Sequence, residues 1–328
     1  MMLAEGSRRW PWLLLLAVAV VGPPLTGQPY VAHLMVLGSL AALLAVGLNV
    51  ALGFAGLFSF AQGAFYGIGA YVSALLVLSC GAGFWTAFLA AGVAAGLAGL
   101  LLGLLTIRLG GHYLAIATFA FQEIVIVVIR NWDSVTKGPL GLSGVPGPAP
   151  LALPGLPPIE FQSELAYYYL ALAVLVLAVA VSWRLRTSQI GLELLAVRDD
   201  EVAARAMGVR AVQLKIFAFS ASAVLAGLAG SLFAHYVKNV SPESFAVATS
   251  FAVLVSVLVG GLGTIMGPVL GGIALTFLPE YLRVFQEHRF TIYGALLIVV
   301  VIALPGGVAG ALQTLARQWR ARAQAARP

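Results

Sequence analysis

Residues 184–215 read RLRTSQIGLELLAVRDDEVAARAMGVRAVQLK, and this polar stretch lies between two long apolar segments. It holds ten charged residues, whereas the whole chain is 9% charged and 61% hydrophobic. A soluble domain has about 25% charged residues, so the rest of this sequence is typical of helices that span a bilayer. The composition therefore predicts an all-α, polytopic membrane protein in which residues 184–214 form one polar loop.

A membrane-spanning helix needs about 20 mostly apolar residues. Working outward from the polar loop, we expect a bundle of eight to ten such helices within a single transmembrane domain, residues 1–328. The candidate spans are residues 10–26, 31–52, 57–79, 84–106, 113–130, 165–183, 214–236, 246–262, 265–282 and 290–305. We expect the first span to be retained, although its short apolar run after two arginines also fits a cleaved signal sequence.

Basic residues are distributed unevenly between the two sides of this arrangement. With ten spans and both termini inside, thirteen of the 18 Lys and Arg residues are cytoplasmic. The positive-inside rule therefore predicts a multi-pass membrane protein with both termini in the cytoplasm. Contact with anionic lipid headgroups, rather than nucleic acid, then explains the net charge of +6. Residues 131–164, rich in Gly and Pro, form the main outer loop, where we expect turns and extended chain.

The polar loop contains signals for two short helices. Ser188 is suited to cap the first, which should end near Val197. The second covers residues 199–207; its acidic first turn favours the positive end of the helix dipole, and Gly208 is its C-terminal stop. A short helix with its own boundaries and small side chains indicates a docking element for a partner, and an ordinary solvated loop is the alternative.

Two glycine-rich stretches, residues 53–69 and 260–272, resemble each other loosely and each occurs at the start of a predicted span. Interrupted helices at corresponding positions of two halves would indicate an internal repeat around a transport pathway. Alternatively, glycines four residues apart allow neighbouring helices to pack closely. The sequence leaves both interpretations open.

Polar side chains inside a span tend to face the bundle interior or a pathway, because lipid does not solvate them. Thr118 and Gln122 share a helix face, and Glu123 beside them is the only acid well inside a span. A structural hydrogen bond between helices, or for Glu123 a pair with a cation such as Arg108, is the alternative to a pathway role. The candidates for the translocation pathway are Asn49, Ser59, Gln62, Thr118, Gln122 and Glu123.

Six separated motifs follow one another along the chain. They are GLN (47–49), GFAGLFSFAQGAFYGIGAY (53–71), TIRLGGHYLAIATFAFQEI (106–124), NWDSVTKGPLGLSGVPG (131–147), RTSQIGLELLAVRDDEVAARAMGV (186–209) and VLVGGLGTIMGPVLGG (257–272). In these motifs and their order, the chain resembles the LivM-type permease family of branched-chain amino acid ABC transporters over roughly residues 30–305. Within the fifth motif, EVAARAMG (201–208) is similar to the EAA-type loop of ABC importer permeases, with one extra residue. The chain departs from many relatives at Gln62, where they have a His.

The resemblance implies the permease subunit of a binding-protein-dependent ABC importer that carries branched-chain or other hydrophobic amino acids inward. It also implies a second permease subunit, ABC ATPase subunits that contact the polar loop, and a substrate-binding protein at the outer face. The implied coupling residues are Arg198, Asp199, Asp200, Glu201, Ala203, Ala204 and Gly208. In the outer loop, Trp132, Asp133 and Lys137 are candidate contacts for the binding protein, and membrane anchoring of the aromatic residue is the alternative.

Two alternatives to this function stay open. The same architecture is compatible with urea or short amides as cargo. A stand-alone secondary transporter is the rival class, although only Glu123 supplies the mid-membrane ionisable group that such proteins often use.

No residue pattern indicates catalysis or a bound metal or cofactor. The four histidines lack the convergent spacing of metal ligands, and no nucleophile is paired with a base. None of the three lysines follows a glycine, so the chain has no G-x-x-x-x-G-K-[S/T] phosphate-binding loop. We therefore expect no cofactor and no enzymatic activity, and ATP that drives transport would be hydrolysed on another chain.

Overall fold

The computed structural model describes residues 28–106, 109–150, 161, 163–282 and six single positions between 292 and 310. Within these residues, seven helices are long and apolar enough to cross a membrane. The expected all-α polytopic fold is therefore confirmed. The expected spans 10–26 and 290–305 lie outside the described residues, apart from four single positions of the second.

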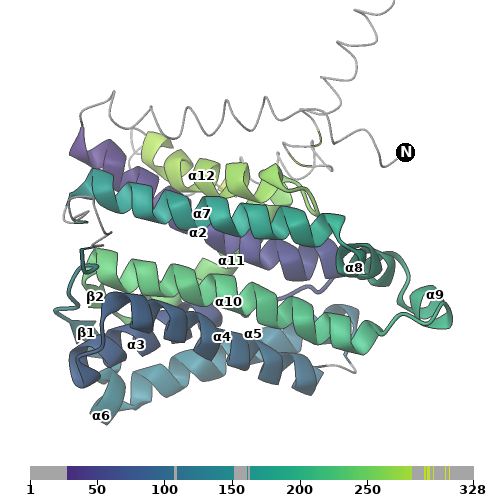
Figure 1. The fold of residues 1–328 in the computed structure, drawn as a ribbon, viewed down its shortest axis with the longest axis horizontal. Helices are drawn as coiled ribbons and strands as arrows, with labels where there is room; N and C mark the ends of the chain where they lie inside the picture. Colours follow the sequence, from purple (N-terminus) through teal and green to yellow (C-terminus); the bar gives the residue numbers. More distant parts are fainter. Residues whose placement is uncertain are drawn as a thin grey trace, which may run out of the picture.

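The long helices of the described part lie side by side in one bundle (Figure 1). They are α2 (Pro29–Asn49), α3 (Gln62–Cys80), α4 (Phe84–Thr106), α5 (Gly111–Asn131), α7 (Glu164–Thr187), α10 (Ala211–Val237), α11 (Val247–Gly260) and α12 (Met266–Tyr281). The expected span 265–282 is thus present as α12, but this helix has only 16 residues and contains Pro279. It is shorter than the roughly 20 residues that cross a bilayer without tilt.

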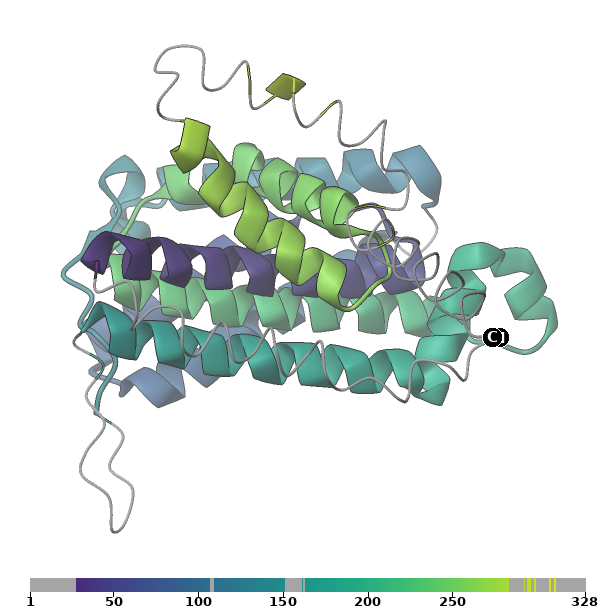
Figure 2. The same ribbon diagram turned by 90° about the horizontal axis from the view of Figure 1, so that it is seen from above.

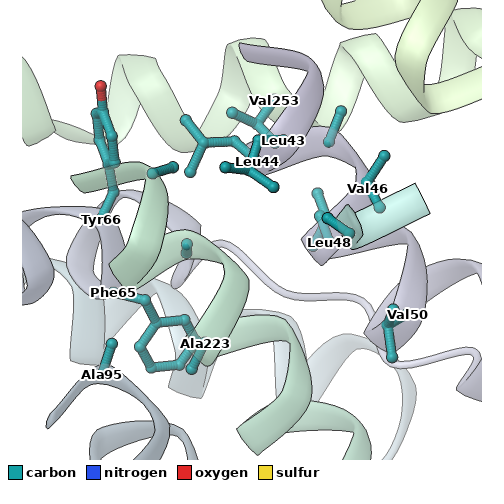
Figure 3. Close-up of a cluster of buried hydrophobic side chains, with 14 of the residues drawn as sticks. Leu43, Leu44, Val46, Leu48, Val50, Phe65, Tyr66, Ala95, Ala223 and Val253 are labelled. Carbon is teal, nitrogen blue, oxygen red and sulfur yellow. The ribbon is translucent and has the colours of Figure 1, made fainter. Parts of the chain in front are cut away.

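Helix α10 is the centre of the bundle and packs against α4, α3 and α2. Glycines on the facing helices make this close approach possible: a Cβ at Gly99 of α4 would lie 2.6 Å from the Cβ of Ala223. A Cβ at Gly69 of α3 would lie 2.3 Å from the carbonyl oxygen of Gly227. Because lipid gives apolar helices little reason to associate, such dispersion contacts supply much of the packing energy. Figure 3 shows part of the apolar core, including Phe65 and Ala223.

Two breaks interrupt the helices at the glycine-rich stretches. The first follows α2 and comprises a π-helix, η1 (Val50–Phe54), and the non-helical residues 56–60. The expected span 57–79 therefore begins later than predicted, at Gln62. The second break, residues 261–265, separates α11 from α12.

The two breaks contact each other through Asn49. Its side-chain amide donates to the carbonyl oxygen of Thr264 at 2.9 Å and accepts from the backbone N–H of Gly263 at 2.9 Å. The same stretches also pack closely, since a Cβ at Gly271 would lie 2.0 Å from the carbonyl oxygen of Ser256. These stretches therefore both interrupt helices and permit close packing, whereas an internal repeat around a transport pathway stays a prediction.

The polar segments gather at the two opposite ends of the bundle (Figure 1). At one end, α8 (Gln189–Asp199) and α9 (Glu201–Ala206) project beyond the long helices, as Figure 2 also shows. The opposite end contains α6 (Asp133–Thr136), the 3-10 helices η2 (Gly138–Leu140) and η3 (Pro242–Phe245), and an antiparallel pair of strands, β1 (Leu142–Ser143) and β2 (Asn239–Val240). The expected turns and extended chain are therefore present at residues 141–150, whereas the short helices α6 and η2 were not expected, and residues 151–160 of the outer loop lie outside the described part.

Candidate functional site

Side-chain caps set where the two helices of the projecting end, α8 and α9, begin. The side chain of Ser188 accepts a hydrogen bond from the backbone N–H of Gly191 at 3.3 Å and so begins α8, as predicted. Asp200 caps α9, because its Oδ1 accepts from the backbone N–H groups of Val202 at 2.9 Å and Ala203 at 3.0 Å. These bonds satisfy donors that a short helix leaves free at its N-terminus.

The boundaries of α9 differ from the predicted 199–207. Asp199 is the last residue of α8, because the extended backbone of Asp200, with φ of −155°, separates the two helices. At the other end, α9 stops at Ala206, and Gly208 takes the left-handed φ of +85° that permits the chain to turn. The predicted stop at Gly208 is confirmed, whereas Asp199 was assigned to the wrong helix.

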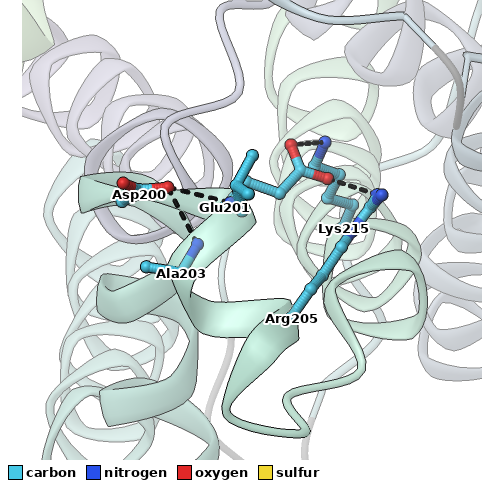
Figure 4. Close-up of polar contacts among 6 residues, drawn as sticks. Asp200, Glu201, Ala203, Arg205 and Lys215 are labelled. Atoms are coloured by element: carbon cyan, nitrogen blue, oxygen red, sulfur yellow. Dashed lines mark hydrogen bonds and ion pairs between the residues drawn. The ribbon is translucent and has the colours of Figure 1, made fainter.

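Glu201 ties α9 to the central helix (Figure 4). One carboxylate oxygen lies 2.6 Å from the Nζ of Lys215 on α10, and the other lies 2.5 Å from a guanidinium nitrogen of Arg205. The Lys215 side chain is only 11% exposed, so this ion pair is screened less than an ordinary surface pair. Sequence reasoning missed Lys215, because a partner 14 residues away follows no helical spacing.

Helix α9 presents apolar side chains to its surroundings. Val202 is 79% exposed and Met207 is 85% exposed, and Ala203 between them is also exposed, whereas Ala204 faces the protein. Sequence reasoning passed over Val202 and Met207, although apolar residues in an otherwise polar loop were a signal. Exposed apolar groups on a short projecting helix suit a partner surface.

Arg198 extends from α8 to the first helical break. Its Nη1 donates to the carbonyl oxygen of Gly53 in η1 at 2.5 Å. The structure thus places Arg198 beside the residues that Asn49 holds together, at the base of the projecting end.

Three of the six predicted pathway residues, Ser59, Thr118 and Gln122, bind backbone N–H groups at the start of α3. This helix begins without a cap from its own N-cap residue, Ala61. Four backbone N–H groups at residues 60–64 instead donate to side chains, and three of these four side chains belong to α5 and α11. The pairs are Phe60 N with Thr118 Oγ1 (3.1 Å), Ala61 N with Ser59 Oγ (3.2 Å), Gly63 N with Ser250 Oγ (2.7 Å) and Ala64 N with Gln122 Oε1.

Gln62 and Gln122 are each bound at both ends of the side-chain amide. Gln62 donates to the carbonyl oxygen of Leu44 at 3.1 Å and accepts from the hydroxyl of Ser222 at 3.1 Å. Gln122 also donates to the carbonyl oxygen of Phe245, at 2.7 Å. Because a buried backbone group has no water to bind inside a bilayer, these contacts hold the non-helical segments in place.

Glu123 is separate from the other pathway candidates and lies on the exposed face of α5. Only 28% of the α5 span is buried, the smallest share among the seven spans of the described part. Neighbours on the same face, Ile116 and Val127, are exposed apolar residues. Arg108, its proposed ion-pair partner, lies outside the described residues.

At the end opposite α9, the structure brings together Trp132, Asp133 and Lys137. All three are exposed on the short turn that contains α6, directly after α5. The hydroxyl of Thr136 anchors this turn by donating to the carbonyl oxygen of Ile129 at 2.6 Å. The turn therefore forms a compact polar and aromatic surface at this end.

A cavity of about 250 Å³ lies between α2, α3, α11 and α12. Its described lining is mainly apolar, with hydroxyl groups from residues such as Tyr66, Thr249 and Ser256, and includes no charged residue. Among the described residues, no group of three or more His, Cys, Asp or Glu side chains converges as metal ligands would. The polar chemistry of the described part is thus concentrated at the two ends and around the start of α3.

Comparison with known proteins agrees with this arrangement. Residues 30–305 match the family described as branched-chain amino acid transport system / permease component. The chain is 37% identical over 311 residues to the high-affinity branched-chain amino acid transport system permease protein LivM of Escherichia coli strain K12, covering 90% of this chain and 73% of that protein.

The high-affinity branched-chain amino acid transport system permease protein LivH of Escherichia coli strain K12 is 25% identical over 302 residues, covering 84% of this chain and 92% of that protein. The autoinducer 2 import system permease protein LsrC of Yersinia pestis is 37% identical over 107 residues, or 31% of this chain and 30% of that protein. No solved structure matches the chain.

Proposed function

We propose that this chain, which belongs to the branched-chain amino acid transport system permease family, is the membrane-spanning subunit of a binding-protein-dependent ABC importer. Its cargo would be branched-chain amino acids, moved inward across a bacterial-type plasma membrane, and residues 1–328 would form one permease domain. The observation that carries the proposal is the projecting α8–α9 pair, which exposes apolar side chains and is tied to the central helix by Glu201.

Helix α9 would seat in a groove of an ABC ATPase subunit. Asp200 keeps the helix wound outside the bundle, and Val202 and Met207 supply the exposed apolar contacts. The ion pair between Glu201 and Lys215 would pass a movement of α9 on to α10, which packs against three other long helices. The chain would thus contribute no ATP hydrolysis of its own.

The exposed face of α5 would be covered by a second, homologous permease. Relatives of this chain include two different permease proteins, LivM and LivH, whose names refer to the same kind of transport system in one organism. A carboxylate that faces hydrocarbon is strongly unfavourable, so Glu123 suits an interface or a hydrated pathway better than lipid. The buried candidates Asn49, Ser59, Gln62, Thr118 and Gln122 would hold the helices that border this pathway.

The two ends would then face opposite sides of the membrane. The basic residues of 184–215 support a cytoplasmic position for α8, α9 and both termini, in keeping with the positive-inside rule. Trp132, Asp133 and Lys137 would lie at the outer surface, where a substrate-binding protein delivers its cargo. Their grouping on one anchored turn supports this assignment.

Reconstitution into proteoliposomes tests the function. The chain would be combined with the second permease, the ATPase subunits and the binding protein encoded with it, and uptake of radiolabelled leucine and urea would be measured. We expect leucine uptake that requires ATP and the binding protein. Uptake of urea alone would reassign the cargo, and leucine uptake by the isolated chain in an ion gradient would identify a secondary transporter.

A further inference from the structure

We infer that Arg198 is a positioning residue that links the projecting α8–α9 pair to both helical breaks, so that a movement of α8 displaces the breaks. This inference rests on the proposed function, because the movement would come from an ATPase subunit docked on α9. It identifies a second connection from the loop into the bundle, separate from the ion pair between Glu201 and Lys215.

The Arg198 side chain lies against three glycines, Gly53, Gly56 and Gly263. A Cβ at Gly263 would lie 2.6 Å from Nη1 of Arg198, and a Cβ at Gly56 would lie 3.1 Å from its Cγ. Gly53 supplies the carbonyl oxygen that accepts the hydrogen bond. Gly56 and Gly263 have φ of +70° and +69°, which side chains rarely allow. The backbone at both breaks is therefore shaped so that one guanidinium fits between them.

The charge of Arg198 suits this position. Gly53 belongs to the last helical turn of the first break, just before the non-helical residues 56–60, where helix carbonyl groups point away from the helix and carry the negative end of its dipole. A guanidinium that donates to such a carbonyl makes a charge-assisted hydrogen bond, which is stronger than a neutral one. The residue as a whole is exposed, so this bond can open without unpacking the core.

The contact continues from the first break to the second. Asn49, one turn before Gly53, binds the backbone of both Gly263 and Thr264. A displacement of Gly53 by Arg198 therefore reaches the start of α12 through two hydrogen bonds. Non-helical segments can bend without breaking a ladder of helical hydrogen bonds, which makes them the natural places for such a movement.

The test compares R198Q and R198K with R184Q in the complete reconstituted importer. Arg184 lies exposed in the last turn of α7, on the same side of the membrane, so R184Q matches the loss of charge at a distance from the breaks. We expect R198Q to retain ATPase subunits and ATP hydrolysis, while leucine uptake per ATP falls about tenfold, the factor that corresponds to about 1.4 kcal/mol. R198K should lie between R198Q and the unchanged chain, and R184Q should match the unchanged chain.

A labelling experiment detects the movement itself. Cys80, the only cysteine, is replaced by Ser, and Leu262→Cys puts an exposed thiol in the second break. We expect its labelling rate to change when ATP and vanadate trap the ATPase, and to stay constant in the R198Q chain.

Three results would overturn the inference. The first is normal uptake per ATP in R198Q, and the second is a labelling rate at position 262 that still changes in R198Q when the ATPase is trapped. The third is loss of ATPase binding in R198Q, which would make Arg198 a docking residue. Should R198Q fail to assemble in the membrane, R198K with normal uptake per ATP and a normal labelling response would overturn the inference equally. An unchanged chain that binds no ATPase subunit would instead refute the proposed function itself.

Discussion

The projecting α8–α9 pair and the start of α3 are both rich in polar groups, but they use them in opposite ways. Around the start of α3, the side chains of Thr118, Gln122 and Ser250 bind backbone groups inside the bundle. At the projecting pair, by contrast, Val202 of α9 and Met207 just after it are exposed.

The first region, the start of α3, stabilises the fold of the bundle, and the second, the projecting pair, is available to bind a partner. Polar groups around α3 complete a helix end that no water reaches, so they determine whether the bundle folds. The polar groups of α8 and α9 maintain a short helix outside the bundle and connect it to α10. Substitutions in the first region should therefore lower stability, and substitutions in the second should lower transport in a folded protein.

The largest effect is expected for E201K. The new cation faces Lys215 and Arg205 in place of the carboxylate that joins them, so α9 detaches from α10. We predict that ATP-driven leucine uptake falls about a hundredfold, equivalent to a loss of ~2.7 kcal/mol in docking of the ATPase, with unchanged insertion in the membrane. Uptake assays and membrane fractionation measure the two quantities.

E193K is the matched control for this change, because it makes the same charge reversal at a carboxylate of α8 and leaves the ion pair between Glu201 and Lys215 in place. G208V should resemble E201K, since valine is strained at the φ of +85° that the turn requires. Normal uptake in both E201K and G208V would show that the projecting end is an ordinary solvated loop.

Gln122 lies on the buried face of α5 and its neighbour Glu123 on the exposed face, so substitutions of the two compare these faces. Q122L leaves the backbone of Ala64 and Phe245 without a partner, and we predict a loss of about 2 kcal/mol in the stability of the isolated chain. E123Q should leave that stability unchanged. Unfolding curves in detergent measure both, and equal curves for the two variants would contradict the account of the α3 start.

A smaller effect is predicted for E123Q in the complete importer. If Glu123 faces the second permease, its neutralisation should weaken the recovery of that subunit about fivefold, in keeping with the ~1 kcal/mol of polar contacts between membrane helices. Quantitative mass spectrometry of purified complexes gives the ratio. Unchanged recovery together with unchanged uptake would place Glu123 outside the interface.

The smallest effect is predicted for D200A. Loss of an N-cap removes about 1 kcal/mol from a helix, so α9 should fray and uptake should fall about threefold at limiting ATPase concentration. D199A is the control, because Asp199 ends α8 and does not cap α9. A greater loss of uptake in D199A than in D200A would contradict the helix boundaries described above.

The features that follow from neighbouring residues were predictable. Long apolar segments gave most of the helices, and Ser188 and Gly208 marked the ends of the projecting pair because caps act within a few residues. The position of the first break was only partly predictable, since the glycines indicate it but the non-helical residues 56–60 depend on side chains from α5.

The contacts between distant residues were not predictable from one sequence. Lys215 with Glu201, Ser250 with Gln122, and Arg198 with Gly53 are separated by 14, 128 and 145 positions. No helical spacing or local propensity connects such pairs, and only the folded bundle brings them together. The outward direction of Glu123 likewise depends on which face of α5 the other helices cover.

The central claim, that α8 and α9 dock an ATPase, is tested most directly by purifying the chain from its native membranes in mild detergent and identifying what accompanies it by mass spectrometry. We predict that an ABC ATPase and a second permease co-purify with the unchanged chain, and that the ATPase is lost from the E201K chain. Purification of the unchanged chain alone, or only with itself, would contradict the claim.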